Sequence, residues 1–358
     1  MSTLKVNAIR NTSASSDAIT LASDGTATAK ITNNLSNRNL IINGAMQVAQ
    51  RGTSSTTSGM STLDRWENAF SGQDEALTQA QHALTSSDTG PWEKGFRNSL
   101  HITNGNQTSG AGTSDNSYTT YGFEAQDIAN SGWNYTSTSS YITLSFWIKS
   151  SVAQDFKGYL KTEDGTEKSY PFATGSLSAD TWTKVTKTIP GHADLQFDND
   201  TDKGLVLTLF QFIGTGSTGS VTENAWANWS GSTQTADQTS TWWTTNNATW
   251  EITGVQLEVG DVATDFEHRS YGDELARCQR YYWENEQKYY GFQYSSGYKM
   301  CDIPHPVEMR VVPTETMTVH SGSWTHISET TTKFMAYASS AYDSTGVYFT
   351  KVVFNAEL

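Results

Sequence analysis

Short runs in which apolar and polar residues alternate are the feature that most constrains the fold of this chain. The run YITLSFWIK, residues 141–149, places four apolar side chains on one face, namely Ile142, Leu144, Phe146 and Ile148. Residues 181–189 and 250–259 alternate in a similar way, and residues 204–214 are almost continuously apolar, as a central strand of a sandwich can be. Many short strands separated by polar loops are typical of β-sandwiches. We therefore expect an all-β fold with a central jelly-roll β-sandwich over residues 41–270.

The segment YGDELARCQRYYW, residues 271–283, interrupts the strand pattern. Leu275, Cys278 and Tyr282 fall at the i, i+3, i+7 spacing of one helical face, and Asp273 can cap the first turn. These features predict a short connecting helix over residues 271–283. A thiol on the apolar face of a helix is ordinarily inert, and no histidine lies near this one in sequence, so we interpret Cys278 as a packing residue and not as a nucleophile.

The two ends of the chain differ from the middle. Residues 284–358 return to strand patterns and predict a small C-terminal β-domain, with a hairpin about residues 295–297 and a short strand over residues 307–312 between prolines. Residues 1–40 contain only short alternating patches, none of which can make a core alone. We expect this N-terminal segment to become stable by pairing with copies of itself or with another protein. The chain has two cysteines, too few for a disulfide framework, and both are expected to be reduced.

The composition favours a protein that works outside a cell and excludes several partners. Only 17% of the residues are charged, against about 25% in ordinary soluble domains, so solubility rests largely on hydroxyl and amide groups, as in many extracellular β-proteins. The formal net charge is -14, from 37 acids against 23 lysines and arginines, and no basic cluster occurs. Such a surface repels phosphate backbones, which argues against nucleic-acid binding. No segment is apolar enough to span a bilayer, so membrane insertion is not expected either.

The N-terminal sequence MSTLKVNAIRNTSASSD has no apolar run behind its charges, so we expect no signal peptide. A chain with an extracellular composition and no export signal must leave the cell by another route. Release by lysis, as part of a virus particle assembled in the host cytoplasm, is one such route. Composition by itself does not choose between such routes.

Six segments stand out as motifs: NLIINGAMQVAQRG (39–52), LDRW (63–66), YITLSFWIKS (141–150), ITGVQLEVGDVATDFEHRSYGDELARCQRYYW (252–283), VEMRVVPT (307–314) and the terminal FNAEL (354–358). They resemble tail-fibre and receptor-binding proteins of tailed bacteriophages. The resemblance covers most of residues 39–358, and residues 252–283 are its most specific part. The N-terminal STLKVNAIR and AITLASDGTATAKI are similar to the virion-attachment ends of such fibres, especially in marine and cyanobacterial phages.

This resemblance implies a homotrimeric virion appendage whose middle domain is a jelly roll similar to carbohydrate-binding modules. It also implies attachment to a phage tail or capsid protein through residues 1–40, and contact between the β-domains and a host surface polysaccharide or lipopolysaccharide. The family supplies no catalytic motif. Attachment to the tail or to the head is left open.

Tryptophans crowd into residues 223–250 and make this segment the first candidate for glycan binding. Sugars are commonly bound by laying the apolar face of the ring on an aromatic side chain while amides and carboxylates take the hydroxyl groups. The alternative is that these rings anchor loops onto the sandwich or lie at a subunit interface. Trp250 opens a strand and is expected in the core. The candidates for glycan contact are Trp226, Trp229, Trp242 and Trp243.

A tyrosine-rich hairpin over residues 289–298 is the second candidate for glycan contact. Tyrosine offers a large rigid surface with a polar tip, which suits recognition surfaces. The candidates in this segment are Tyr289, Tyr290 and Tyr294. Because alternate positions of a hairpin are buried, part of the set is expected to face a core.

An acidic turn is the candidate metal site. Asp198, Asp200 and Asp202 follow one another at i, i+2 and i+4, a spacing that can wrap a calcium ion. The turn glycine comes at position seven of the loop and position twelve is Leu209, so this is not an EF-hand, and a solvated acidic turn is the alternative reading. We expect no cofactor and leave structural calcium open at this turn.

No motif in the sequence indicates an enzyme. The chain contains no G-x-S-x-G, H-E-x-x-H or P-loop, and its seven histidines match no zinc spacing. Any chain with this many acids can supply the two carboxylates of a glycosidase, so their presence carries no weight. We expect a non-enzymatic, homotrimeric phage tail fibre that binds a host surface glycan during adsorption. The alternatives are a structural head-fibre or capsid decoration protein and, third, a polysaccharide depolymerase.

Overall fold

The computed structural model describes residues 6–13, 17–29, 37–290, 292–295, 298–321, 323–339 and 348–358. Helices in these residues are short: α1 (Ala125–Ala129), α2 (Thr241–Thr244), α3 (Tyr271–Gln279) and the 3-10 turns η1 (Trp92–Lys94) and η2 (Thr215–Ser217). The remaining regular elements are strands, so the prediction of an all-β fold is confirmed. Within the described residues, none of the helices has the length and apolar character needed to cross a membrane.

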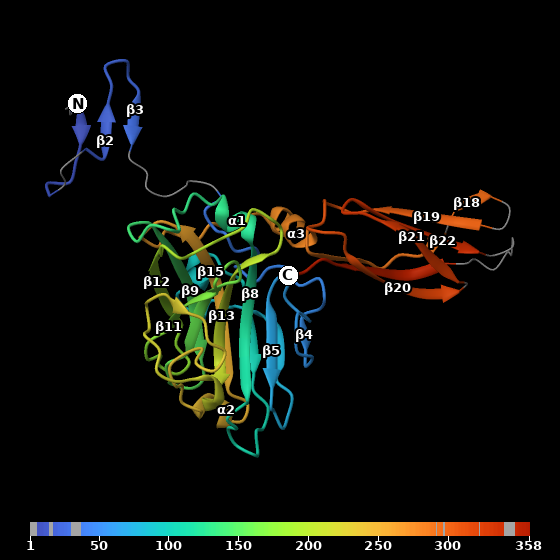
Figure 1. The fold of residues 1–358 in the computed structure, drawn as a ribbon, viewed down its shortest axis with the longest axis horizontal. Coiled ribbons are helices and arrows are strands. Elements are labelled where there is room, and N and C mark those ends of the chain that lie inside the picture. The colour runs from blue at the N-terminus through green and yellow to red at the C-terminus, as the bar shows by residue number, and fades with distance from the viewer. Residues whose placement is uncertain are drawn as a thin grey trace.

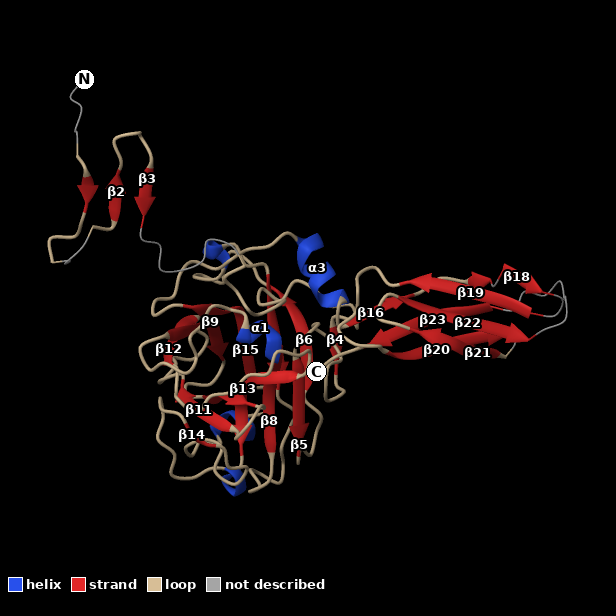
Figure 2. Cartoon of the chain, turned by 45° about the horizontal axis from the view of Figure 1, so that its top comes forward, coloured by secondary structure: helices blue, strands red, loops and turns tan. Residues whose placement is uncertain are grey.

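The central part of the chain is a sandwich of two six-stranded antiparallel sheets (Figures 1 and 2). The first, the β13 sheet, has the order β14 (Ala227–Asn228), β11 (Lys168–Ala173), β10 (Lys157–Thr162), β13 (Lys203–Ile213), β8 (Asn116–Glu124) and β5 (Glu67–Ser71). The second, the β15 sheet, has the order β12 (Thr183–Pro190), β9 (Tyr141–Ser150), β15 (Thr249–Val259), β7 (Asn98–Thr103), β6 (Thr78–Ala83) and β4 (Ser54–Ser55).

The core lies between the two sheets and follows the alternation in the sequence. On β9 the four apolar side chains of the inner face are completely buried, as predicted: Ile142, Leu144, Phe146 and Ile148. Trp250 at the start of β15 is also fully buried, as expected. Each such side chain contributes about 1.5–3 kcal/mol by leaving water. The outer faces of both sheets are thereby left for polar groups and for contacts with partners.

Helix α3 begins where predicted but is capped and ended differently. Ser270 is the N-cap, because its hydroxyl oxygen accepts a hydrogen bond from the Asp273 backbone N–H at 3.2 Å and donates one to the Asp273 carboxylate at 2.7 Å. The helix ends at Gln279, so its predicted extension to residue 283 is wrong. Tyr282 instead pairs with Asn355 in a sheet, and these main-chain bonds replace those of a longer helix.

The buried face of α3 is partly polar. It consists of Glu274 and Cys278, whereas Leu275 remains partly exposed. Glu274 accepts a hydrogen bond from the backbone N–H of Asn43 and lies 3.6 Å from the guanidinium of Arg269. Burial raises the pKa of the Cys278 thiol well above its ordinary value, so the thiol stays protonated. The interpretation of Cys278 as a packing residue is consistent with this environment.

Residues beyond α3 form a second β-unit with its own core (Figure 2). One sheet joins β16 (Tyr282–Asn285), β23 (Tyr348–Asn355) and β17 (Tyr289–Tyr290), with β20 (Thr314–Ser321) also pairing with β23. The other has the order β18 (Phe292–Ser295), β19 (Tyr298–Pro304), β22 (Lys333–Ser339) and β21 (Trp324–Glu329). The pairing of β18 with β19 is the predicted hairpin.

The predicted strand over residues 307–312 is wrong, because this segment forms a loop that reaches back to the sandwich. The guanidinium of Arg310 donates hydrogen bonds to the backbone carbonyls of Thr201 at 2.6 Å and Ala356 at 2.8 Å. Its backbone N–H donates to the carbonyl of Arg280 at 2.8 Å. The prolines around this segment therefore bound a loop and not a strand.

A buried ion pair joins the two β-units. The guanidinium of Arg65, 1% exposed, pairs with the carboxylate of Glu357, donates to the carbonyl of Gly122 at 2.7 Å and lies 3.5 Å from the ring centroid of Tyr281. Arg51 lies 3.0 Å from the other oxygen of the Glu357 carboxylate. The second-last residue of the chain is therefore fixed against the sandwich.

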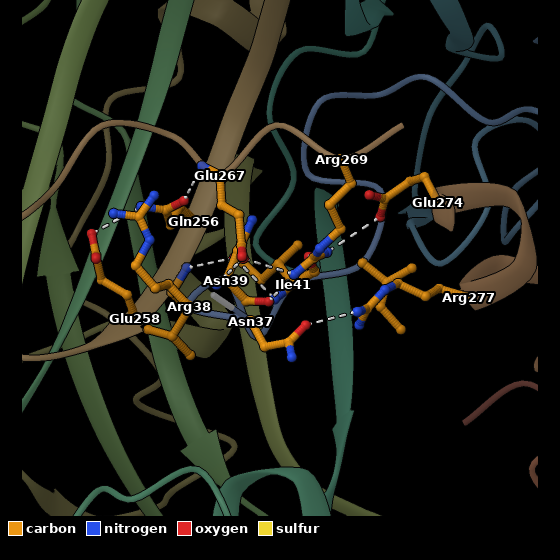
Figure 3. A network of polar contacts seen from close by, with 12 residues as sticks. Asn37, Arg38, Asn39, Ile41, Gln256, Glu258, Glu267, Arg269, Glu274 and Arg277 are labelled. Atoms are coloured by element: carbon orange, nitrogen blue, oxygen red, sulfur yellow. Dashed lines mark hydrogen bonds and ion pairs between the residues drawn. The ribbon is translucent and has the colours of Figure 1, made fainter. Parts of the chain in front are cut away.

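A second polar network fixes the start of the sandwich, and Figure 3 shows it from close by. Arg269 donates hydrogen bonds to the backbone carbonyls of Asn39 and Ile41, and Glu267 accepts one from the Asn39 backbone N–H at 2.9 Å. Arg277 on α3 donates to the side-chain oxygen of Asn37 at 3.0 Å. The segment before the first sandwich strand is therefore held by the loop that leads into α3.

The N-terminal segment forms a small antiparallel sheet of β1 (Ala8–Ile9), β2 (Ile19–Leu21) and β3 (Ala27–Ala29), drawn in blue in Figure 1. Within the described part of the chain, these strands pair only with one another. Three of its apolar side chains are exposed: Val6, Ile9 and Leu21. Sheets this small are marginally stable alone.

Replacing Arg65 by Met tests how much the joining ion pair contributes. The change leaves the buried Glu357 with Arg51 as its remaining cation, and loss of one partner of a buried pair costs about 3 kcal/mol or more. We expect a free energy of unfolding lower by that amount in urea denaturation. Lys333→Met, which removes the exposed pair with Asp302, is the control and should cost at most about 1 kcal/mol. Equal effects of the two variants would contradict the role given to Arg65.

Candidate functional site

Aromatic side chains gather on the outer face of the β13 sheet. Because side chains alternate along a strand, Tyr118 on β8, Tyr159 on β10 and Phe210 on β13 all point away from the core. Register brings them together, since Phe210 is the direct partner of Tyr118 and Thr208 is the direct partner of Tyr159. Three strands thus supply one continuous aromatic surface.

Trp229 extends this surface beyond the strands. Its ring centroid lies 4.9 Å from that of Tyr159, while the ring of Phe210 lies 5.8 Å from Tyr159 and 5.6 Å from Tyr118. The Lys161 ammonium lies 5.1 Å from the centroid of the Trp229 ring, within reach of a cation–π contact. Phe210 is almost fully buried beneath the other rings, whereas Tyr118 and Trp229 remain partly exposed. Phe210 and the largely buried Tyr159 therefore form the floor, and the partly exposed rings of Tyr118 and Trp229 face solvent.

The sequence of β13 produces this surface. A strand with one face in water normally carries polar residues there, but β13 places Val206 and Phe210 on its outer face. Gln211 faces inward by the ordinary alternation and accepts a hydrogen bond from the Ser117 hydroxyl at 2.9 Å, and a β-bulge between Phe210 and Phe212 brings Phe212 into the core as well. Bulges commonly re-aim side chains beside functional sites.

The aromatic surface lines a groove of about 510 Å³, which we call the aromatic groove. Its polar lining offers both hydrogen-bond acceptors and donors: Glu67, Thr120, Glu163, Lys203, Thr208 and Gln234. Rings that can stack with a flat apolar face, next to carboxylate, amide and hydroxyl groups, are the combination that a sugar requires.

Both tyrosine hydroxyls of the groove stay protonated at neutral pH. Burial raises the pKa of Tyr159 to about 12. Burial, and to a smaller extent the carboxylate of Glu67, raises the pKa of Tyr118. Each hydroxyl can therefore donate as well as accept a hydrogen bond.

Two of the tryptophans predicted for glycan contact have different environments. Trp229 lies in the aromatic groove. Trp226 is partly buried, donates its indole N–H to the carbonyl of Pro190 at 2.7 Å and packs its ring 5.4 Å from that of Tyr170. Trp226 therefore anchors its loop onto the sandwich, which is the alternative that the sequence left open.

Trp242 and Trp243 require a correction, because both are fully buried in the sandwich core. The indole N–H of Trp243 donates to the carbonyl of Gly110 at 3.0 Å, and its ring stacks on Phe212 at 5.1 Å. The indole N–H of Trp242 donates to the carbonyl of Thr249 at 3.0 Å. Side chains with no exposed surface cannot contact a glycan, so these two close one end of the sandwich.

The tyrosine hairpin gives little support to the second candidate surface. Tyr289 stacks on Phe349 with ring centroids 4.8 Å apart and packs against the core of the C-terminal unit. Burial raises the pKa of Tyr289 to about 12. The side chains of Tyr290 and Tyr294 lie outside the described residues.

The acidic turn does not form a converging metal site. All of its carboxylates are exposed, and the side chain of Asp202 is 84% exposed. Among the described residues, the groups of three potential ligands that converge do not include Asp198, Asp200 or Asp202. Asp200 instead accepts a hydrogen bond from the backbone N–H of Asp202 at 3.0 Å, as in an ordinary polar turn. The structure therefore favours the solvated acidic turn over the calcium site.

Sequence reasoning missed Tyr118, Tyr159 and Phe210. A signal for them was present, because residues 204–214 are apolar at positions of both faces. The run predicts a central strand, which β13 is, but it does not show which other side chains pack on the outer face of that strand.

No protein-family model and no curated protein sequence matches the chain. Solved structures that are similar to it include the enzymatically active domain of tailspike protein 4 of bacteriophage CBA120, at 10% identity and a TM-score of 0.33, over 62% of this chain and 21% of that one. The N-terminal cellulose-binding domain of β-1,4-glucanase C from Cellulomonas fimi is 12% identical, with a TM-score of 0.28, over 61% of this chain and 99% of that one. A family 11 carbohydrate-binding module from Clostridium thermocellum is 11% identical, with a TM-score of 0.27, over 61% of this chain and 98% of that one. These likenesses concern the fold alone.

Trp243→Ala tests the assignment of this residue to the core. Removal of a fully buried tryptophan costs about 3–5 kcal/mol, so we expect a free energy of unfolding lower by that amount in urea denaturation. Trp92→Ala, at a partly exposed position, is the comparison and should cost clearly less. A stable Trp243→Ala variant would show that the side chain is accessible after all.

Proposed function

We propose that this protein is a non-enzymatic phage virion fibre that binds host surface glycans in the aromatic groove. The observation that carries the binding proposal is the continuous surface of Tyr118, Tyr159 and Trp229 beside carboxylate and amide groups. A sugar ring stacks on the exposed rings, and its hydroxyl groups bond to the polar lining.

Weak binding at each groove suits a protein present in several copies. Three subunits in a fibre, and several fibres on a particle, multiply the affinity of a weak site by roughly 10² to 10⁴ without new contacts. The exposed apolar side chains of the N-terminal sheet support its pairing with other copies or with a phage tail or capsid protein. Further exposed β-branched side chains lie in the C-terminal unit, where they can meet another subunit: Val312, Val319 and Ile327.

The two alternatives predict different behaviour of the same groove. A head-fibre or capsid decoration protein does not need the groove for adsorption. A polysaccharide depolymerase would release reducing ends from the glycan that it binds. Because Trp242 and Trp243 are buried, Trp229 is the residue whose substitution separates these functions without removing core side chains.

Trp229→Ala is expected to weaken glycan binding by about tenfold or more, since central aromatic contacts carry much of the energy of an interface. The full chain is first screened on an array of bacterial polysaccharides and lipopolysaccharides, and the best ligand is then titrated by calorimetry. Trp92→Ala, on the outer side of the opposite sheet, is the matched control and should bind like the wild type. Unchanged binding by Trp229→Ala would show that the aromatic groove is not the glycan-binding site. Release of reducing ends from the glycan would favour the depolymerase.

The solution mass of the purified chain tests the trimer. We expect about three times 39.3 kDa for the full chain by light scattering. A variant without residues 1–40 should likewise show three times its own, smaller chain mass, because the β-domains themselves offer exposed apolar side chains. A monomer in both cases would remove the gain from multiple copies and favour a decoration protein organised by the particle.

A further inference from the structure

The outer face of the β15 sheet carries a row of ionisable side chains from four neighbouring strands. Glu251 on β15 is the direct register partner of His101 on β7 and of Lys149 on β9. His82 on β6 lies opposite Ser99, the neighbour of His101 on the same face of β7. Side chains at paired positions of adjacent strands lie close together, so register alone assembles residues that are distant in sequence.

Three potential ligand atoms in this row converge. The Nδ1 atom of His82 lies 3.1 Å from one carboxylate oxygen of Glu251, and the Nδ1 atom of His101 lies 3.4 Å from the other. One ligand atom from each of the three residues falls within 4.8 Å of the others. In a tetrahedral zinc site with bonds of about 2.0–2.1 Å, neighbouring ligand atoms are about 3.3–3.4 Å apart. The distance between His82 and its Glu251 oxygen is close to such an edge, and the remaining ligand atoms lie within 4.8 Å.

The orientation of His101 leaves a nitrogen without a partner. Its Nε2 atom lies 3.1 Å from the Thr103 hydroxyl oxygen, which can accept the N–H bond of that nitrogen. In this tautomer Nδ1 carries a lone pair, and Nδ1 is buried without a hydrogen-bond partner. In that tautomer the lone pair of Nδ1 is available to bind a metal ion.

Neighbouring side chains form the hydrogen bonds that usually orient metal ligands. Metal-bound histidines commonly donate their second ring N–H to a neighbouring oxygen, and ligating carboxylates are themselves hydrogen-bonded. Here Thr103 lies beside His101, and Glu251 accepts a hydrogen bond from the Ser99 hydroxyl at 2.7 Å. The side chain of Glu251 is 3% exposed and that of His82 is 48% exposed, so the group is fixed at one end and open to solvent at the other.

We propose that His82, His101 and Glu251 bind a divalent transition-metal ion, with Zn²⁺ as the best match. Two imidazole nitrogens and one carboxylate suit Zn²⁺ better than the all-oxygen coordination of Ca²⁺ or Mg²⁺. The fourth position faces the solvent side of His82 and is open to water. The ion links β6, β7 and β15 on the face opposite the aromatic groove, so the proposal does not rest on glycan binding.

Lys149 is the competing cation. Its ammonium lies 2.9 Å from the Glu251 oxygen that faces His101, and also 3.1 Å from Asp88. Asp88 keeps this charge paired, and the metal ion uses the Glu251 oxygen that faces His82. The alternative to a bound metal ion is protonation of the two histidines. They would then form ion pairs with Glu251, and no metal ion would bind.

Calorimetric titration of Zn²⁺ into the untagged, chelator-treated full chain at pH 7.5 tests the proposal. We expect one saturable site per chain, and visible absorption typical of tetrahedral coordination when Co²⁺ replaces Zn²⁺. His101→Ala and His82→Ala should each weaken binding by more than about tenfold, because even the loss of a supporting partner costs 10–100-fold. The matched control is His192→Ala, which removes an exposed histidine beside Asp194 and should bind like the wild type.

Circular dichroism of the metal-free variants confirms that each is folded, and the largely exposed His82 gives a variant that leaves the core intact. The absence of saturable binding by the wild type would overturn the proposal in favour of the ion-pair network. Binding that survives in the double variant His82→Ala, His101→Ala would overturn it in favour of an adventitious ion elsewhere. Loss of zinc binding with unchanged glycan binding is the expected combination, since the two sites lie on opposite sheets.

Discussion

The arrangement of the two β-units depends on the buried ion pair between Arg65 and Glu357. A guanidinium with 1% of its surface exposed must be paired, because an uncompensated buried charge is strongly destabilising. Its partner is the second-last residue of the chain, so the last strand has to return to the sandwich. The ring of Tyr281, which follows α3 in the chain, packs against the guanidinium of Arg65. This ion pair therefore fixes the end of the C-terminal unit against the sandwich, together with the contacts of Arg310 and Arg280.

Three of the sequence motifs meet at this junction. LDRW supplies Arg65, the segment after α3 supplies Tyr281, and FNAEL supplies Glu357. The dense run of charged and aromatic residues at 271–283 is explained by the same contacts, since Arg280 pairs with the buried Glu124 at 2.9 Å. These residues hold the protein together, and the proposed glycan and metal sites lie elsewhere, on the two outer faces of the sandwich.

On both outer faces, the pairing and register of the strands bring the site residues together. Tyr118, Tyr159 and Phe210 form a groove because β8, β10 and β13 are neighbours. His101 meets Glu251 because β7 pairs with β15 in one particular register. The sequence showed each of these residues in an alternating run, but periodicity along a strand carries no information about which strand lies beside it. This is why the glycan candidates named from sequence included only one residue of the groove.

The sequence by itself determined the fold class, the inner face of β9, the start of α3 and the packed Cys278, because local periodicity reports burial directly. Only the tertiary structure decided that Trp242 and Trp243 are core residues, that Trp229 belongs to a groove, and that the acidic turn does not converge on a metal. The physical reason is that exposure and convergence of side chains depend on contacts between segments far apart in the chain. A strand pattern fixes two faces, and the neighbouring strands decide what each face can bind.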